Sequence, residues 1–205
     1  MKKDLEINSE EIDILKELGN IGLGNATISL SEMLKDEKIK MLVPDVSLIS
    51  LAEVPDLVGG PEKPVAAVFS RAIGEASFFL IFLMPEKSAL NIIKALTEGI
   101  REEFCSLGRS VIREVGNIVS ASYLNALSFL TDSAYRQTPP ILAIDMAGAI
   151  LGTIFAEASI IEDSILMVKT SFSTEVNDIE GCLIIVPHGE GLKNIVDILG
   201  LELKK

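Results

Sequence analysis

The chain has 205 residues, 48% of them hydrophobic, and is long enough to bury one sizeable core. Its formal net charge of −12 argues against nucleic acid or an anionic membrane surface as a partner, because both attract clustered lysine and arginine. A single histidine, His188, excludes a histidine-rich metal site and leaves carboxylates, amides, hydroxyls and backbone groups for any chemistry.

No segment of the sequence predicts insertion into a membrane. The apolar run FFLIFLM at 78–84 is too short to span a bilayer, and no apolar segment follows the N-terminal lysines as in a signal peptide. We therefore expect a cytoplasmic protein. Cys105 and Cys182 are isolated from each other, so we expect small buried hydrophobic residues and neither a disulfide framework nor a metal site. His188 follows a predicted strand and is expected to be a turn or cap residue.

Hydrophobic periodicity in the first half predicts a long helix over about 9–35, with Asn8 as its N-cap. Glu10 and Glu11 fall in the first turn, where their charge favours the helix dipole. The elements expected next are a strand near 40–50, a Pro/Gly-rich connection at 55–64, two strands near 65–73 and 76–84 paired across Gly74 and Glu75, and a helix near 85–98.

The second half repeats this order of elements. We expect a long helix near 102–131, strands near 140–145, 164–173 and 181–187, and a last helix near 190–199. The second half differs from the first at the apolar segment 145–159, which is expected to be helical where the first half has only a loop.

An internal repeat explains the similarity of the halves, which span about 9–100 and 106–200. Three polar positions of the first long helix recur 97 residues later in the second: Asp13, Glu17 and Asn20, then Ser110, Glu114 and Asn117. Continuous apolar strands such as 78–84 are typical of central strands covered on both faces. We therefore predict one α+β domain over residues 1–205 with pseudo-twofold symmetry. Its shared β-sheet would be covered by the two long motif-bearing helices and by shorter helices.

The repeated polar residues share one stripe of each helix. A helix turns by about 100° per residue, so the spacing i, i+4, i+7 keeps Asp13, Glu17 and Asn20 together, opposite an apolar face that would reach the core. Ordinary solvated surface is the simplest interpretation, and pairing of the glutamates with Lys16 or Arg113 is another. Duplication favours a function, because the halves differ at most positions and share Glu-x-x-Asn.

Glycines interrupt both long helices, although each costs about 1 kcal/mol relative to alanine. Gly19 and Gly116 lie on the flank of the stripe, and Gly22 and Gly24 occur in the first helix alone. We expect these positions to mark close approach of another helix or strand and to have no direct catalytic role.

An exposed carboxylate beside an amide suits a reaction in which the partner supplies the reactive group. The carboxylate can bind a cationic side chain by a charge-assisted hydrogen bond. The amide can hold a water molecule in line with a phosphoryl group. Phosphoryl transfer needs little covalent help from the protein, so positioning a water molecule is a sufficient role.

The motif resembles that of the CheC/CheX/FliY family of chemotaxis phosphatases. The family pattern is Asp or Ser, three residues, Glu, two residues, Asn and, further on, a proline. The chain has it twice, as Asp13, Glu17, Asn20 and Pro44, and as Ser110, Glu114, Asn117 and Pro140. Two motifs in a chain of this length resemble the CheC branch more than the shorter, single-motif CheX.

The resemblance implies hydrolysis of the aspartyl phosphate of the response regulator CheY, with Mg²⁺ carried by the regulator and no cofactor of the chain's own. It implies that Glu17 and Glu114 bind the regulator's lysine and that Asn20 and Asn117 orient the attacking water. Asp13 and Ser110 would line the docking surface. We expect a monomer that binds neither nucleic acid nor membrane.

The resemblance also implies a second partner, the receptor deamidase CheD. Asp145 and Met146, at the start of segment 145–159, are the candidate contact, and an ordinary packed helix is the alternative for that segment. A different function stays open: a binding module that regulates CheD or docks CheY at the flagellar switch without hydrolysis.

Overall fold

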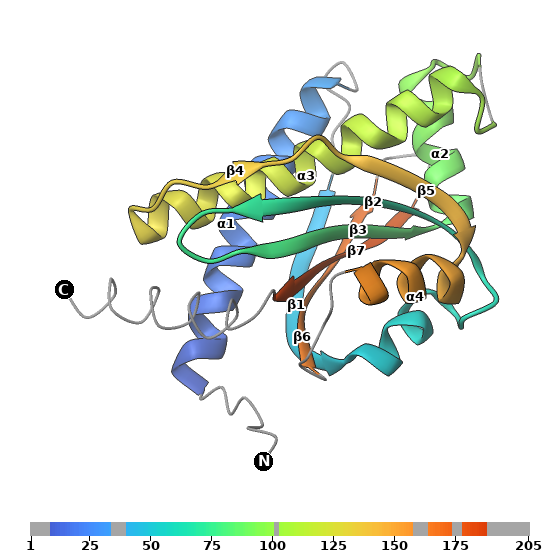
Figure 1. Ribbon diagram of the computed structural model, residues 1–205. Helices are drawn as coiled ribbons and strands as arrows, with labels where there is room; N and C mark the ends of the chain where they lie inside the picture. Colours follow the sequence, from blue (N-terminus) through green and yellow to red (C-terminus); the bar gives the residue numbers. More distant parts are fainter. Residues whose placement is uncertain (1–8, 34–39, 101–102, 158–163, 174–177, 188–205) are drawn as a thin grey trace.

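Two long helices and a seven-stranded sheet make up most of the fold (Figure 1). The computed structural model describes residues 9–33, 40–100, 103–157, 164–173 and 178–187. The helices are α1 (Ser9–Met33), α2 (Glu86–Leu96), α3 (Ser106–Thr131) and α4 (Ala147–Glu157), with a 3₁₀ helix, η1 (Leu51–Val58). The strands are β1 (Lys40–Ser50), β2 (Pro64–Ile73), β3 (Phe78–Pro85), β4 (Arg136–Gln137), β5 (Ile141–Met146), β6 (Ser164–Ser173) and β7 (Asp178–Pro187).

Every helix and strand predicted from periodicity on these residues is present, with ends displaced by a few residues. The predicted helix at 190–199, the expected cap Asn8 and His188 lie outside the described residues. Neither β4 nor η1 was predicted from the sequence pattern. A Ser50 and Glu53 capping box begins η1, and Pro55 lies inside it.

The helix predicted for 145–159 forms as α4, but the prediction that it has no counterpart in the first half is wrong. The 3₁₀ helix η1 follows β1 directly, just as α4 follows β5. Displaced by 97 residues, the span of η1 falls within α4. The two halves therefore differ in the length and type of this helix and not in its presence.

The strand order shows the predicted duplication in one shared sheet. All pairs are antiparallel, and the order is β1-β6-β7-β3-β2, with β5 and β4 both paired to β2. Apart from the two-residue strand β4, each half contributes three strands, and the third strands, β3 and β7, meet at the centre. The first strand of each half pairs with the second strand of the other, as β1 with β6 and β5 with β2. This exchange of strands favours one folding unit, which stays a prediction.

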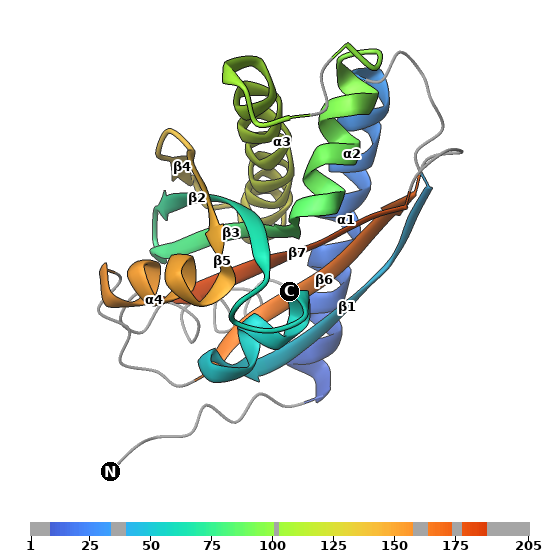
Figure 2. The same ribbon diagram turned by 90° about the vertical axis from the view of Figure 1, so that its right-hand side faces the viewer.

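The sheet is buried on both faces. Helices α1, α2 and α3 cover one face, and η1 and α4 cover part of the other (Figure 2). Alternate residues of β3 divide between the two cores: Phe78, Leu80 and Phe82 on the side of the long helices, Ile81 and Leu83 on the side of α4. The expectation that FFLIFLM is a central strand is confirmed.

Glycines set how closely α1 and α3 pack. A Cβ at Gly22 would lie 2.9 Å from the Cα of Tyr123, and one at Gly116 would lie 2.4 Å from the Cβ of Val68 on β2. The predicted close approach is therefore confirmed at both positions, and Gly19 is buried. At Gly24 the prediction is wrong, because nothing would lie within 4 Å of a Cβ there.

The two cysteines are free and differ in burial. Cys182 is buried in the core beneath α4, as expected. Cys105 is only partly buried, because it is the N-cap residue of α3 and lies outside the helix body. No helix of the described residues is long and apolar enough to cross a membrane.

Candidate functional site

The stripe predicted on each long helix faces away from the sheet. Asp13, Glu17 and Asn20 are exposed on α1, whereas Leu15 and Leu18 between them are buried in the core. The polar residues are four and three positions apart, a spacing that places them on one face of a helix. Helix periodicity therefore accounts for this division.

The second stripe has the same orientation with one difference. Ser110 and Glu114 are exposed on α3, and Asn117 is partly buried. Val115 and Val119 of the same helix are buried in the core. Asn117 is therefore less open to solvent than Asn20.

The glutamates are available to a partner. Lys16 Nζ lies 3.9 Å from Asp13 Oδ1, so the proposed pairing of Lys16 with Glu17 is not observed. Within the described residues, neither Glu17 nor Glu114 makes a hydrogen bond or an ion pair. The Ser110 hydroxyl donates to the carbonyl oxygen of Ser106 at 3.0 Å, within its own helix.

A rigid base supports both stripes. Helices α1 and α3 pack against each other through Gly22 and Tyr123, and α3 rests on β2 through Gly116 and Val68. Helices α1 and α3 lie on the same face of the sheet (Figures 1 and 2), and the motif residues are on the side of these helices that faces away from the core. Sites on packed helices hold their geometry better than sites on loops.

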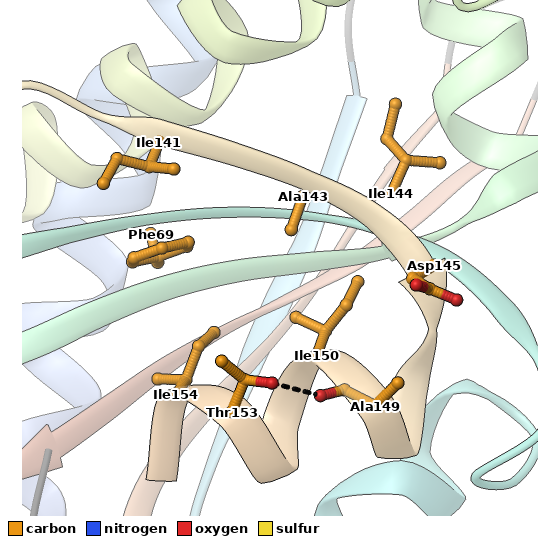
Figure 3. A pocket seen from close by; sticks show the side chains of 9 residues that line it. All are labelled: Phe69, Ile141, Ala143, Ile144, Asp145, Ala149, Ile150, Thr153 and Ile154. Atoms are coloured by element: carbon orange, nitrogen blue, oxygen red, sulfur yellow. Dashed lines mark hydrogen bonds between the residues drawn. The ribbon is translucent and has the colours of Figure 1, made fainter. Parts of the chain in front are cut away.

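A second candidate site lies on the opposite side of the sheet, between β5 and α4. It is a pocket of about 430 Å³, lined by Phe69, Ile141, Ala143, Ile144, Asp145, Ala149, Ile150, Thr153 and Ile154 (Figure 3). Asp145 lies at the end of β5, and its Oδ1 accepts a hydrogen bond from the Met146 backbone N–H at 2.7 Å. Met146 is 50% exposed.

Sequence reasoning selected Asp145, which lines this pocket, and the adjacent Met146, which does not, and it missed the other lining residues. Ile150 and Ile154 are one turn apart on α4 and point toward β5 (Figure 3), and Phe69 comes from the neighbouring strand. The helical spacing of the two isoleucines was a usable signal. The contribution of β2 was not visible, because it depends on strand pairing.

The α+β fold is similar to those of solved structures of FliY and CheX proteins. Thermotoga maritima FliY is similar with a TM-score of 0.77 and 17% identity, over 97% of this chain and 100% of that one. A chain of the CheX–CheY–BeF3–Mg complex of Borrelia burgdorferi is similar with a TM-score of 0.53 and 18% identity, over 87% of this chain and 99% of that one. At these identities the likeness establishes the fold.

Sequence similarity then defines the family. A model of the CheC-like family matches residues 10–48, which contain the first motif. The CheY-P phosphatase CheC of Bacillus subtilis (strain 168) is 31% identical over 204 residues, covering 96% of this chain and 97% of that protein. The chain belongs to the CheC-like family, and the resemblance drawn from the two motifs is confirmed.

Proposed function

We propose that the protein is a phosphatase that hydrolyses the aspartyl phosphate of the response regulator CheY. The observation that carries this proposal is the pair of outward-facing Glu-x-x-Asn stripes, whose glutamates are exposed and have no partner among the described residues. The 31% identical relative is a CheY-P phosphatase, and its similarity extends over both motifs.

In this mechanism the chain binds and orients, and the regulator brings the reactive groups. Glu17 or Glu114 binds the regulator's active-site lysine, which places the neighbouring amide at the phosphoryl group. Asn20 or Asn117 holds a water molecule in line with the phosphorus. The water oxygen bonds to phosphorus as the bond to the aspartyl oxygen breaks, giving inorganic phosphate and a free carboxylate. Asp13 and Ser110 border the docking surface.

Mg²⁺ enters this reaction as part of the substrate. Bound to the regulator, it neutralises charge that develops on the phosphoryl oxygens. Among the described residues of the chain, no three metal-binding side chains gather.

The test is the lifetime of phosphorylated CheY with the wild-type chain and with Asn20→Ala/Asn117→Ala. Loss of a group that positions the reacting water costs about 100-fold in rate, as for other positioning groups. We therefore expect the double variant to leave the lifetime near that of CheY alone. Decay as fast as with the wild type would refute the proposal.

A second candidate function is a binding module that regulates the deamidase CheD. The observation that favours it is the apolar pocket between β5 and α4, with Asp145 at its end and Met146 exposed beside it. Asp145→Lys should abolish capture of CheD and leave CheY dephosphorylation intact. If wild-type protein captures CheD and leaves the lifetime of phosphorylated CheY unchanged, the binding module is the better description.

A further inference from the structure

Each motif helix carries a large apolar side chain in line with its glutamate. Ile28 on α1 is 61% exposed, and Leu107 on α3 is 50% exposed. At 100° per residue, Ile28 lies about 20° from Glu17 around its helix, and Leu107 lies about 20° from Glu114. Neither side chain is part of the two hydrophobic cores of the described residues.

These two residues lie on opposite sides of their motifs along the helix axis. Ile28 follows Asn20, about 14 Å from the middle of its Glu-x-x-Asn pair, and Leu107 precedes Glu114, about 13 Å from the middle of the other. The repeat does not preserve either one. The position equivalent to Ile28 is Asn125, and the position equivalent to Leu107 is Glu10.

Whether a docked partner contacts Ile28 and Leu107 depends on the size of the interface that it forms. A partner seated on the Glu-x-x-Asn pair would cover about 800 Å² of this chain, a patch of about 16 Å radius. Ile28 and Leu107 fall inside that radius. Phe129, at 82% the most exposed large apolar side chain among the described residues, lies about 20 Å from its motif and falls outside.

We propose that Ile28 and Leu107 are docking residues of the two sites, and that they bind apolar surface of the phosphorylated regulator beside its active site. The inference rests on the proposed function. Because the two contacts lie on opposite sides of the motif, each helix selects regulators by apolar surface at a different place. Ile28 and Leu107 therefore act on substrate affinity, and the chemical step is left to the glutamate and asparagine.

The test separates the sites by inactivating one at a time. In an Asn117→Ala background only the α1 site works, and Ile28→Asn should raise KM for phosphorylated CheY about fivefold with kcat unchanged. In an Asn20→Ala background only the α3 site works, and Leu107→Gln should have the same effect. Each substitution should be silent in the other background. Phe129→Ser is the matched control, because it removes exposed apolar surface outside the interface, and should leave KM unchanged in both.

Binding distinguishes failure of this inference from failure of the proposed function. For binding, one site is removed through its glutamate, because the asparagine substitutions leave docking intact. Ile28→Asn in a Glu114→Ala background and Leu107→Gln in a Glu17→Ala background are titrated with CheY activated by beryllofluoride and Mg²⁺, with Phe129→Ser as the control in both. Each docking substitution should raise Kd about fivefold and be silent in the other background. Binding with this pattern but without hydrolysis would overturn the phosphatase proposal and support the docking residues. Equal effects of all three substitutions, or a fall in kcat alone, would overturn the assignment of Ile28 and Leu107 as docking residues. Absence of both binding and hydrolysis would overturn both proposals.

Discussion

Between Ser9 and Asn20, α1 carries four acidic and one basic side chains, whereas the matching stretch of α3, Ser106 to Asn117, carries one acidic and two basic. The net charges are −3 and +1. Both stretches keep the Glu-x-x-Asn spacing and a buried glycine between the two motif residues. The duplicated helices have therefore retained the motif and its buried glycine, while the charge around each motif has diverged.

The same divergence occurs where the two helices touch. Gly22 of α1 faces Tyr123 of α3, and the residues at the equivalent places, Val119 and Ala26, are both buried in the same core. Each pair takes one residue from each half: one pairs a glycine with a large aromatic residue, and the equivalent positions hold a valine and an alanine. The two helices are therefore not interchangeable at this contact, although both carry the Glu-x-x-Asn motif.

The substitution that should destabilise the fold most is at Gly116. This glycine lies between the glutamate and the asparagine of the second motif, as Gly19 does in the first. Gly116→Ala places a Cβ about 2.4 Å from that of Val68, so we expect a loss of about 3 kcal/mol in the free energy of unfolding. Urea denaturation measures it. Gly24→Ala is the control, because that Cβ meets open space, and it should stabilise α1 by about 0.5–1 kcal/mol. Equal stabilities of the two variants would contradict the close packing of α3 on β2.

A smaller effect compares the two sites directly. A phosphoryl group and the carboxylates that hold Mg²⁺ make the regulator's site a target for positive charge. The difference of four charges should favour docking at α3 by about 1 kcal/mol, after screening. Asn117→Ala should therefore lower the rate of CheY dephosphorylation at low substrate about fivefold more than Asn20→Ala. Single-turnover rates of both variants measure this, and a greater loss with Asn20→Ala would reverse the order.

Periodicity predicted the helices, the strands and the outward stripe, because each of these depends on spacing within one segment. It could not predict that β1 pairs with β6, because the pattern of a strand specifies which faces are buried and not which neighbour it has. The 3₁₀ helix η1 was missed because Pro55 in a short segment is typical of a connection.

Two single residues were predicted wrongly, for different reasons. Gly24 lies four residues after Asn20 and seven after Glu17, so helix periodicity places it on the outward stripe, where nothing would lie within 4 Å of a Cβ. Cys105 was expected in the core because it is apolar, but its place as N-cap of α3 leaves it partly exposed. Residue type and spacing define a face of a helix, whereas tertiary contact decides what meets that face.

A finer test of the charge difference uses one equivalent pair of side chains. Arg113 and Lys16 each precede a motif glutamate, but Lys16 has Asp13 at 3.9 Å, whereas Arg113 has no partner among the described residues. Arg113→Gln in the Asn20→Ala background should raise KM about twofold, the effect of one exposed charge pair. Lys16→Gln in the Asn117→Ala background should change KM less. Both changes in KM should disappear at about 0.5 M salt, where exposed charges are screened. An increase in KM that persists at this salt concentration would indicate that the side chain makes a contact that is not electrostatic.

The smallest effect concerns the side chain that α3 inserts beside α1. Burial raises the pKa of Tyr123 above its ordinary value of 10.0. In the unfolded chain this phenol ionises near pH 10 and in the folded chain it does not, so ionisation stabilises the unfolded state. Stability should be unaffected by Tyr123 below about pH 9 and should fall as pH rises, by about 0.4 kcal/mol at pH 10.

Tyr123→Phe isolates that contribution, because Tyr135 stays in place and its own titration largely cancels between the two proteins. The loss of stability between pH 8 and pH 10, measured by urea denaturation, should be about 0.4 kcal/mol smaller in the variant. The α1 position equivalent to Tyr123 is Ala26, which has no titratable group, so this dependence belongs to one half of the duplication alone. An unchanged pH dependence would mean that the Tyr123 hydroxyl reaches water, and that α1 and α3 are packed less closely than Gly22 permits.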